Sequence, residues 1–404
     1  MPGLPPGAIA LVESPTGRRE FVEVRAVGAK LSRCVPLGSL EGIPAGSVVT
    51  SRGARLAAFV GSNLLGCVTD AWGRADDRTP EAVAPARPAA LNLQARAPVK
   101  AMLRTGVFAI DAMLVLGCGQ RIALTAGSGV GKSTLLRTIV EGAEADARVV
   151  ALIGERARDA VDTIERLKAS AAWPTTTVVF AAADAPPIER FSAARTATAQ
   201  AERLCAAGKH VLLAMDSLTR VAAAWRELCL VAGEPPAHRG YPPSMVGALA
   251  ALVERAGART RGSITAVYAI LVDGDDPFEP VTDAVRALLD GHVVLSRQLA
   301  DAGRFPAIDV LRSLSRTMPS VTSHEQRADA GLLRRMLATL EESEDLFAIG
   351  AYRPGADAWL DACVANRPRL EAALYDGVVE RAERRLADLA RPLKTAAGLT
   401  PGQA

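Results

Sequence analysis

The fold of this chain is decided by one stretch, Ala126-Gly127-Ser128-Gly129-Val130-Gly131-Lys132-Ser133-Thr134, called the P-loop below. A short apolar run, Arg121 to Thr125, precedes it, and apolar residues at helical spacing follow it from Leu135 to Val140. A strand, a glycine-rich loop and a helix in this order are the context that a phosphate-binding loop requires. The stretch departs from the strict pattern at its first position, where Ala126 replaces glycine. A chance glycine-rich turn is the alternative, and the Gly-Lys-Ser-Thr ending between correct flanks argues against it.

The chemistry of the P-loop points to a nucleotide. Its glycines allow backbone N–H groups to converge on phosphate oxygens, and the helix N-terminus adds a partial positive charge. The Lys132 ammonium is able to reach the β and γ phosphates, and the Ser133 hydroxyl is able to hold Mg²⁺. We therefore expect residues 127–134 to bind the phosphates of ATP together with Mg²⁺.

Length and composition bound the class of protein. The chain has 404 residues, of which 49% are apolar, so it can form a large core in two or three domains. Its formal net charge of +3 is too near neutral to argue for nucleic acid or an acidic membrane as a partner. Aromatic residues make up only 4%, which argues against binding of single strands by base stacking.

The sequence favours a reducing compartment. Six scattered cysteines form neither a CxxC motif nor a Cys/His cluster, so neither zinc nor a disulfide framework is indicated. The first residues lack the basic and apolar regions of a signal peptide, and no apolar run approaches the ~20 residues of a membrane span. We predict a cytoplasmic protein that reaches a membrane only through a partner.

Four regions follow one another along the chain. Residues 1–75 resemble short strands between Gly and Pro turns, which predicts a small β-barrel or part of one. Residues 76–100 form a linker rich in proline and alanine. Residues 101–320 alternate strand and helix patterns, which predicts a mostly parallel sheet covered on both faces. Residues 321–404 show helical spacing, for example at Leu333, Met336 and again at Val378 and Val379, and end in a frayed tail.

The strands expected in the first region are Ala8–Val12, Phe21–Val27, Ser47–Val49, Leu56–Val60 and Leu65–Val68. Those expected in the third region are Arg121–Thr125, Val149–Ile153, Thr176–Phe180, His210–Met215, Ser263–Val272 and Gly291–Ser296.

Two carboxylates follow expected strands of the parallel sheet, where open sheets of this kind bind ligands. Glu155 follows the strand after the P-loop helix, so it is able to accept a hydrogen bond from a water aligned on the γ-phosphate. Arg156 beside it is able to stabilise charge on the transferring group. The alternative is an ordinary solvated Glu-Arg pair, and the P-loop tips the choice towards function.

Asp216 ends the apolar strand His210–Met215, which is the Walker B arrangement for reaching Mg²⁺ directly or through water. Its alternative role is to cap the following helix. The acidic loop Asp273–Asp276 lacks EF-hand spacing, so we expect a solvated turn bordering the site. Arg316 carries no signature of its own.

Together these segments resemble the ATPases of type III protein secretion, flagellar or injectisome, which are relatives of the catalytic β subunit of rotary ATP synthases. The resemblance covers most of residues 35 to 375, and its RGYPPS and LDGHxVLSR segments are not generic P-loop features. The matching stretches are Ala126–Leu136, Ala151–Arg156, Met215–Arg220, Ala232–Ser244, Gly262–Ala266, Val272–Pro280, Leu289–Arg297, Phe305–Leu311 and Gly350–Gly355.

The resemblance implies a fold and roles for single residues. The fold is a RecA-like α/β domain around a mostly parallel sheet, with a partial N-terminal β-barrel and a helical C-terminal domain. Lys132 and Ser133 would bind phosphate and Mg²⁺, Glu155 would position water as a base, Arg156 would contact the γ-phosphate, and Asp216 would be the Walker B acid.

Three further roles come from the same resemblance. Phe305 would lie against adenine, and Tyr352 is a second adenine candidate. Arg316 would be an arginine finger that reaches the site of the neighbouring subunit. Such a finger can contribute on the order of 10³–10⁵ in rate.

The resemblance also implies an assembly. We expect a homohexameric ring whose partners are a stator, a central stalk protein and chaperone–substrate complexes, with no nucleic acid. Through partners it would be peripheral at the inner face of the cell membrane. The family has a further N-terminal segment with an extra barrel strand, so we expect the barrel of this chain to be incomplete.

Two other interpretations stand beside the export ATPase. A nucleic-acid motor similar to the terminator Rho would have basic and aromatic residues interleaved near its N-terminus, whereas residues 1–75 contain only Phe21, Phe59 and Trp72 as aromatics. A non-catalytic nucleotide-binding ring subunit would tend to lack the carboxylate at Glu155.

Overall fold

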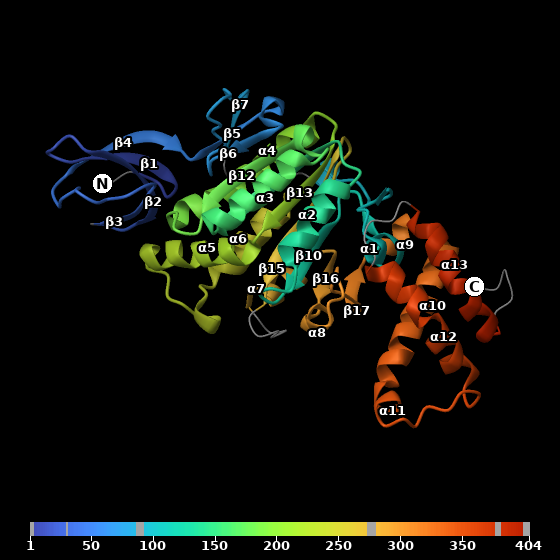
Figure 1. Ribbon diagram of the computed structural model, residues 1–404. Coiled ribbons are helices and arrows are strands. Elements are labelled where there is room, and N and C mark those ends of the chain that lie inside the picture. Colours follow the sequence, from blue (N-terminus) through green and yellow to red (C-terminus); the bar gives the residue numbers. More distant parts are fainter. Residues whose placement is uncertain (1–3, 30, 86–92, 273–279, 376–380, 399–404) are drawn as a thin grey trace.

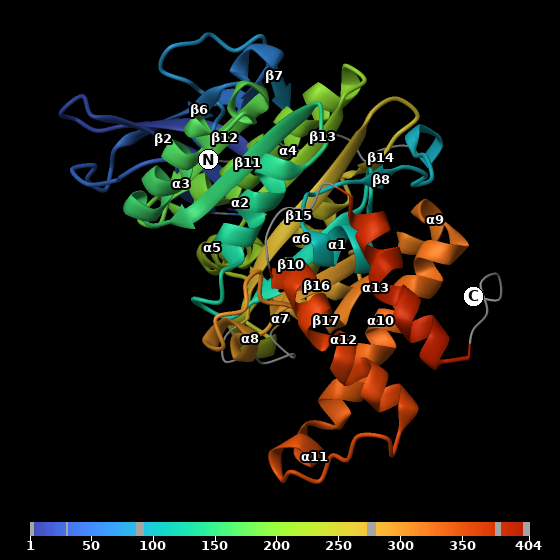
Figure 2. The same ribbon diagram turned by 45° about the vertical axis from the view of Figure 1, so that its right-hand side comes forward.

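The computed structural model describes residues 4–29, 31–85, 93–272, 280–375 and 381–398, and Figure 1 shows their arrangement. An antiparallel sheet lies at the N-terminal end, a large mostly parallel sheet with helices on both faces occupies the middle, and a group of helices lies at the C-terminal end (Figures 1 and 2). This arrangement confirms the predicted fold class. The acidic loop 273–276 and the apolar pair Val378 and Val379 lie outside the described residues.

The N-terminal sheet contains four strands in the order β3-β2-β1-β4. Every neighbouring pair is antiparallel, with Leu11 opposite Phe21 on one side and opposite Thr50 on the other. Its strands are β1 (Ala8–Glu13), β2 (Arg19–Val27), β3 (Ser32–Pro36) and β4 (Val48–Arg55).

The central sheet has the strand order β17-β16-β10-β15-β13-β11-β12-β6, and all pairs along this path are parallel except β16 with β17. A short strand, β14 (Gly257–Ala258), pairs antiparallel with β15. The path contains β6 (Cys67–Thr69), β10 (Arg121–Ala126), β11 (Ala147–Glu155), β12 (Thr176–Ala182), β13 (His210–Asp216), β15 (Ser263–Leu271), β16 (Gly291–Leu295) and β17 (Ile308–Ser315).

Alternation along the buried strands creates two cores. In β11, Val150 and Leu152 face one hydrophobic cluster, whereas Val149, Ala151 and Ile153 face the other. The first cluster contains α2 (Lys132–Gly142) and α3 (Ala157–Ala169). The second contains α4 (Pro187–Ala206), α5 (Leu218–Ala232), α6 (Ser244–Val253) and α7 (Pro280–Arg286).

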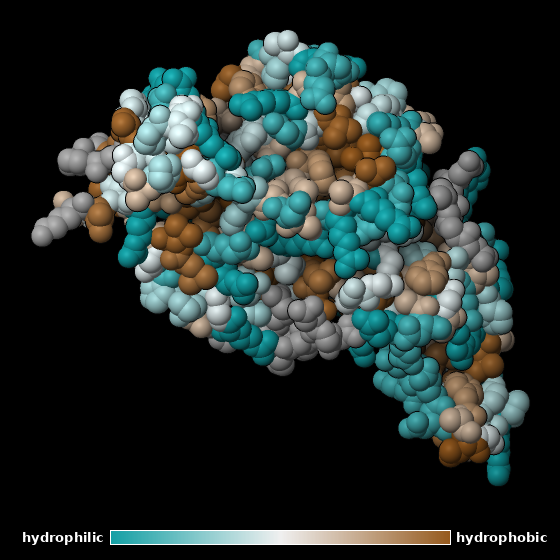
Figure 3. All heavy atoms as spheres, turned by 60° about the vertical axis from the view of Figure 1, so that its left-hand side comes forward, coloured by the Kyte–Doolittle hydropathy of each residue, from teal (hydrophilic) through white to brown (hydrophobic). Residues whose placement is uncertain are grey.

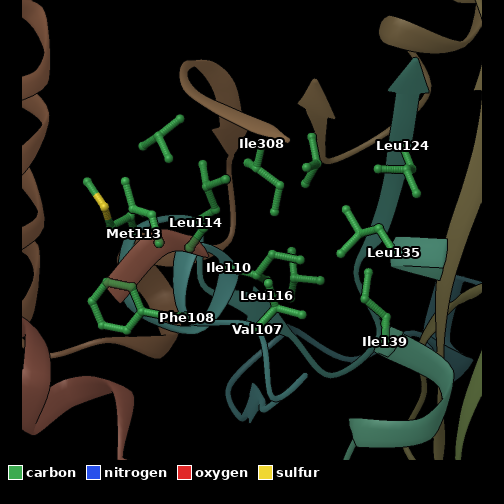
Figure 4. Close-up of a cluster of buried hydrophobic side chains, with 14 of the residues drawn as sticks. Val107, Phe108, Ile110, Met113, Leu114, Leu116, Leu124, Leu135, Ile139 and Ile308 are labelled. Atoms are coloured by element: carbon green, nitrogen blue, oxygen red, sulfur yellow. The ribbon is translucent and has the colours of Figure 1, made fainter. Parts of the chain in front are cut away.

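The first cluster continues without a break into the C-terminal helices. Its bridge is α1 (Phe108–Met113), whose Ile110 belongs to the same hydrophobic cluster as Leu135 of α2 and Ile308 of β17, and Figure 4 shows part of this cluster. The C-terminal helices are α9 (Met318–Val321), α10 (His324–Glu342), α11 (Glu344–Ala348), α12 (Ala358–Tyr375) and α13 (Ala382–Ala396). A further short helix, α8 (Arg297–Asp301), follows β16. Because α1 packs against α10, α12 and α13, the nucleotide-binding sheet and the helical region share one core.

The structure corrects two expectations about the first hundred residues. The strand expected at Leu65–Val68 does not belong to the N-terminal sheet, because Cys67 pairs with Thr177 and β6 forms the edge of the central sheet. The linker 76–100 contains a strand, β7 (Ala82–Pro85), paired with β5 (Ala57–Val60). A short apolar run predicts a strand, but it does not specify the partner strand, because pairing depends on residues far away in the sequence. The domain boundaries themselves stay a prediction.

Strand β17 also escaped the sequence pattern. Two of its inward positions, Ser313 and Ser315, are polar but buried, so apolar alternation is lost after Val310. Their hydroxyls are satisfied by the backbone carbonyls of Asp309 and Val115, at 2.5 and 2.7 Å. A buried hydroxyl with a carbonyl partner is acceptable in a core, and hydrophobic periodicity does not detect it.

The helix that follows the P-loop is closed at its C-terminal end by a buried arginine. Arg148 donates to the carbonyl oxygens of Val140 at 2.7 Å and Ala143 at 2.5 Å, and also to Thr175 Oγ1 at 2.7 Å. Burial lowers the pKa of its guanidinium. A cation at a helix C-terminus satisfies orphan carbonyls and interacts favourably with the helix dipole.

Replacing Arg148→Met is expected to lower the free energy of unfolding by about 2 kcal/mol, because buried carbonyls would lose their donors. Arg137→Met on the same helix is the matched control, since Arg137 makes only a 3.7 Å ion pair with Glu141. Urea unfolding of both variants checks this, and equal stability of the two variants would contradict the capping role.

Candidate active site

The P-loop connects the end of β10 to the start of α2. Gly129 and Gly131 have φ angles of 80° and 92°, in the left-handed region that glycine favours. Gly131 precedes Lys132, the first residue of α2, and no side chain caps this helix. The first N–H groups of the helix therefore remain available to an anion. Val130 differs from its neighbours because its side chain is buried in the core.

Lys132, Ser133 and Asp216 form one cluster. Lys132 Nζ lies 2.8 Å from Asp216 Oδ1, and Ser133 Oγ donates to Asp216 Oδ2 at 2.8 Å. The Asp216 side chain is 4% exposed and the Lys132 side chain 9%, so both charges are largely removed from water. The structure thus brings together three residues that the sequence selected from two distant segments.

Glu155 and Arg220 form a second pair at the same edge of the sheet. Arg220 Nη1 donates to Glu155 Oε2 at 2.7 Å and also to the carbonyl oxygen of Gly154. Arg220 lies in the first turn of α5, four residues after Asp216, and no role was predicted for it from the sequence. The sequence did contain a signal for this role. Side chains in the first turn of a helix point back towards its N-terminus, and this helix begins directly after the strand that ends in the Walker B acid.

A small cavity of about 50 Å³ lies between the two groups of residues. Its polar lining includes Ser133, Glu155, Asp159 and Asp216. Arg156 follows Glu155 at the start of α3 and is exposed. Glu155, Asp216 and Ser133 therefore surround one space next to the P-loop.

The other side of the P-loop contacts the segment after β16. Arg297 Nη2 donates to the carbonyl oxygen of Ser128 at 3.1 Å. Phe305 is 49% exposed, and a Cβ placed on Gly131 would lie 3.4 Å from its ring. An aromatic face thus remains open beside the loop, where Phe305 was expected.

Tyr352 lies in a different environment. Its hydroxyl donates to Asp361 Oδ1 at 2.6 Å, and its ring packs on Phe347 at 5.3 Å between centroids. The hydrogen bond to Asp361 raises the pKa of the phenol. Tyr352 follows α11, which lies at the tip of the C-terminal helices in both ribbon views (Figures 1 and 2). Its role as an adenine contact stays a prediction.

Arg316 is not near the P-loop of its own chain. It follows β17, which is antiparallel to β16, and its N–H donates to the carbonyl oxygen of Asp290 at 2.9 Å. Asp290 contacts Arg121, the first residue of β10, whereas the P-loop begins where β10 ends. A strand of this length separates the two points by roughly 17 Å.

Comparison with known proteins identifies the family. A family model described as "ATP synthase alpha/beta family, nucleotide-binding domain" matches residues 106–315. The chain belongs to this family. A second model, "T3SS EscN ATPase C-terminal domain", matches residues 322–388. The chain is therefore an ATPase, and the P-loop lies within its nucleotide-binding domain.

Relatives of this ATPase occur in flagellar and secretion systems. The "Flagellum-specific ATP synthase" of Treponema pallidum is 42% identical over 96% of this chain and 87% of its own length. The "SPI-1 type 3 secretion system ATPase" of Salmonella typhi is 39% identical over 90% of this chain and 86% of its own. These relatives confirm an ATPase of flagellar or type III protein export.

Solved structures agree with this assignment. The assembled ATPase EscN from the type III secretion system of enteropathogenic E. coli superposes with a TM-score of 0.91 at 35% identity, covering 96% of both chains. EscN in complex with its central stalk EscO gives a TM-score of 0.88. Among the described residues of this ATPase, no helix combines the length and apolar composition of a membrane span.

The surface offers no single dominant feature in the view of Figure 3, where hydrophobic side chains form separate patches among hydrophilic ones. The polar cluster of the P-loop is instead largely enclosed, since Lys132 and Asp216 are both buried. Such a pair should be strongly coupled.

A double-mutant cycle should reveal this coupling. Asp216→Asn alone leaves the Lys132 ammonium without its counter-charge, so it should destabilise the chain more than it does in a Lys132→Met background. We expect a coupling free energy of about 0.5–3 kcal/mol from urea unfolding without nucleotide. Additive effects of the two substitutions would contradict the pairing.

Proposed function

We propose that this ATPase hydrolyses Mg-ATP in a homohexameric ring whose sites are each completed by Arg316 of the neighbouring subunit, and that hydrolysis drives export of protein substrates. One observation carries the proposal. Four residues converge at the carboxyl ends of the parallel strands: Lys132, Ser133, Asp216 and the ion-paired Glu155. Arg316 lies at the opposite end of the strands, where β10 begins.

Residues 127–134 would hold the phosphates of ATP through backbone N–H groups and the Lys132 ammonium. Mg²⁺ would be held by Ser133 Oγ and Asp216 Oδ2, and their spacing of 2.8 Å and their hydroxyl and carboxylate chemistry fit this hard cation. When bound, Mg²⁺ neutralises charge on the phosphate oxygens.

Glu155 would act as the base that orients the attacking water. Its carboxylate lines the cavity beside Ser133 and Asp216, so a water there would lie within reach of both. Arg220 fixes the carboxylate from one side, and Arg156 would contact the γ-phosphate. Catalysis of this kind depends on positioning and electrostatic stabilisation.

The base of ATP would stack on Phe305, whose ring is half exposed next to Gly131. Tyr352 would contribute to the adenine site only if the C-terminal helices approach the P-loop, because its present partners are Asp361 and Phe347.

Arg316 supports a site shared between subunits. Its side chain is exposed and makes no hydrogen bond or ion pair with any residue in the described part of the chain. Since Arg316 lies by the start of β10 and its own P-loop lies at the end of that strand, it would have to serve the site of a neighbouring subunit. A transition-state cation supplied in this way is an arginine finger.

Similarity to assembled EscN and to its complex with EscO supports a ring with a central stalk partner. A stator, chaperone–substrate complexes and a peripheral position at the inner face of the cell membrane complete the proposed setting.

The Mg²⁺-ATPase rate per chain should rise with protein concentration, because sites form only between subunits. Glu155→Gln should abolish the rate while ATP binding persists, and Glu165→Gln on the exposed face of α3 is the matched control. Sedimentation in parallel reports assembly. A concentration-independent rate in a protein shown to stay monomeric would overturn the shared site.

Arg316→Ala should lower kcat by about 10³-fold or more, with little change in KM for ATP. Arg312→Ala is its control, because Arg312 is an exposed arginine of β17, the strand that ends just before Arg316, and within the described residues its ion pair is with Asp309. Similar losses in both variants would show a general effect of the strand.

Phe305→Ala should raise KM for ATP about tenfold, since base stacking contributes about 1–3 kcal/mol. Phe305→Tyr should retain most of the affinity because the ring remains. Steady-state kinetics with ATP check this, and an unchanged KM in Phe305→Ala would rule out the stacking role.

A further inference from the structure

A buried polar cluster holds the backbone around Arg316. Its centre is Gln120, which is fully buried just before β10. Gln120 Oε1 accepts from Gly117 N at 2.9 Å and from Thr317 Oγ1 at 2.5 Å. Its Nε2 donates to Asp290 O at 3.1 Å and to Ser315 Oγ at 3.0 Å. One side chain thus bonds to the residues on both sides of Arg316.

The backbone N–H of Arg316 itself is also held by a hydrogen bond. The carbonyl oxygen of Asp290 accepts both from Arg316 N, at 2.9 Å, and from Gln120 Nε2. The Asp290 carboxylate is fixed in turn by Arg121, whose N–H and Nε donate to Oδ2 at 2.9 and 3.2 Å. The peptide units around Arg316 are therefore anchored to the start of β10.

The guanidinium of Arg316 contrasts with this anchored backbone. It is exposed and unpaired within the described chain, whereas Arg121 and Arg312 on either side have carboxylate partners. A long side chain on a fixed backbone needs to order only its own torsions on meeting a ligand, which lowers the entropy cost of reaching a transition state.

We propose that Gln120 is a positioning residue for Arg316, and that it sets the reach of this arginine into the site of the neighbouring subunit. The inference rests on the proposed shared site. It assigns to Gln120 an effect on catalysis in another subunit, although Gln120 precedes the strand that leads to the P-loop of its own chain.

Two substitutions separate this role from packing. Gln120→Met keeps the length of the side chain and removes every hydrogen bond, whereas Gln120→Glu keeps the acceptor for Gly117 and Thr317 and loses the donor to Asp290 and Ser315. Gln120→Met should lower kcat by about 10²-fold with KM for ATP within about twofold, because misplacement acts on the transition state. Gln120→Glu should lie between it and the unchanged chain.

Subunit mixing provides the decisive measurement. In rings mixed with Lys132→Ala chains, whose own P-loop is disabled but whose Arg316 is intact, sites of Gln120→Met chains receive a correctly placed arginine. The rate per Gln120→Met chain should rise at least about tenfold. Mixtures of Arg316→Ala with Lys132→Ala are the reference, since they should recover in the same way.

The outcomes distinguish the two proposals. Recovery with Arg316→Ala but not with Gln120→Met would overturn the role of Gln120 and leave the shared site intact. Absence of recovery in both mixtures would overturn the arginine finger in trans, and the positioning role with it. An unchanged kcat in Gln120→Met would also overturn it.

Gln200→Met is the matched control for lost stability. Gln200 is an equally buried glutamine of α4, and its side chain bonds to Gly61 N and Gly61 O at 2.9 and 2.7 Å, far from Arg316 in the sequence. The midpoint temperature of thermal unfolding should fall in both glutamine variants, whereas only Gln120→Met should recover its ATPase rate when mixed with Lys132→Ala chains.

Discussion

The ion pair between Lys132 and Asp216 is the contact on which the site depends. It joins the first residue of α2 to the last residue of β13, and the Ser133 hydroxyl donates a hydrogen bond to the second oxygen of the Asp216 carboxylate. Either charge alone would be costly at this depth, because burial removes it from water without a counter-charge. The pair therefore favours the arrangement in which the ends of β10 and β13 lie at one edge, with β15 between them.

Strand register places the remaining groups at that edge. Asp216 is opposite Leu152 on one side and Ala269 on the other, so Glu155 projects slightly beyond the carboxylate of Asp216. The N–H of Leu271 donates to Thr219 Oγ1 at 2.8 Å, which fixes the start of α5 and with it Arg220. The site is thus a product of parallel pairing, in which all strand ends meet on one side.

The opposite end of β10 contains a different kind of chemistry. There, β10 begins among Gln120, Asp290 and the backbone of Arg316, bonded through amide and carbonyl groups. A single strand therefore runs from the polar cluster beside Arg316 to the P-loop. Since β10 has a parallel partner on each side, it is stiff, and the positions of the two ends are linked.

The sequence by itself determined the local elements of the site: the P-loop, the strands ending at Glu155 and Asp216, and the helices between them. These follow from short-range chemistry, since glycine conformation and apolar periodicity act within a few residues. Tertiary structure decided the partners. It placed β6 in the central sheet, paired Arg220 with Glu155, buried Ser313 and Ser315 in β17, and held Arg316 through Gln120. Each of these depends on which distant groups satisfy a buried polar atom or a strand edge, and a local pattern does not specify that choice.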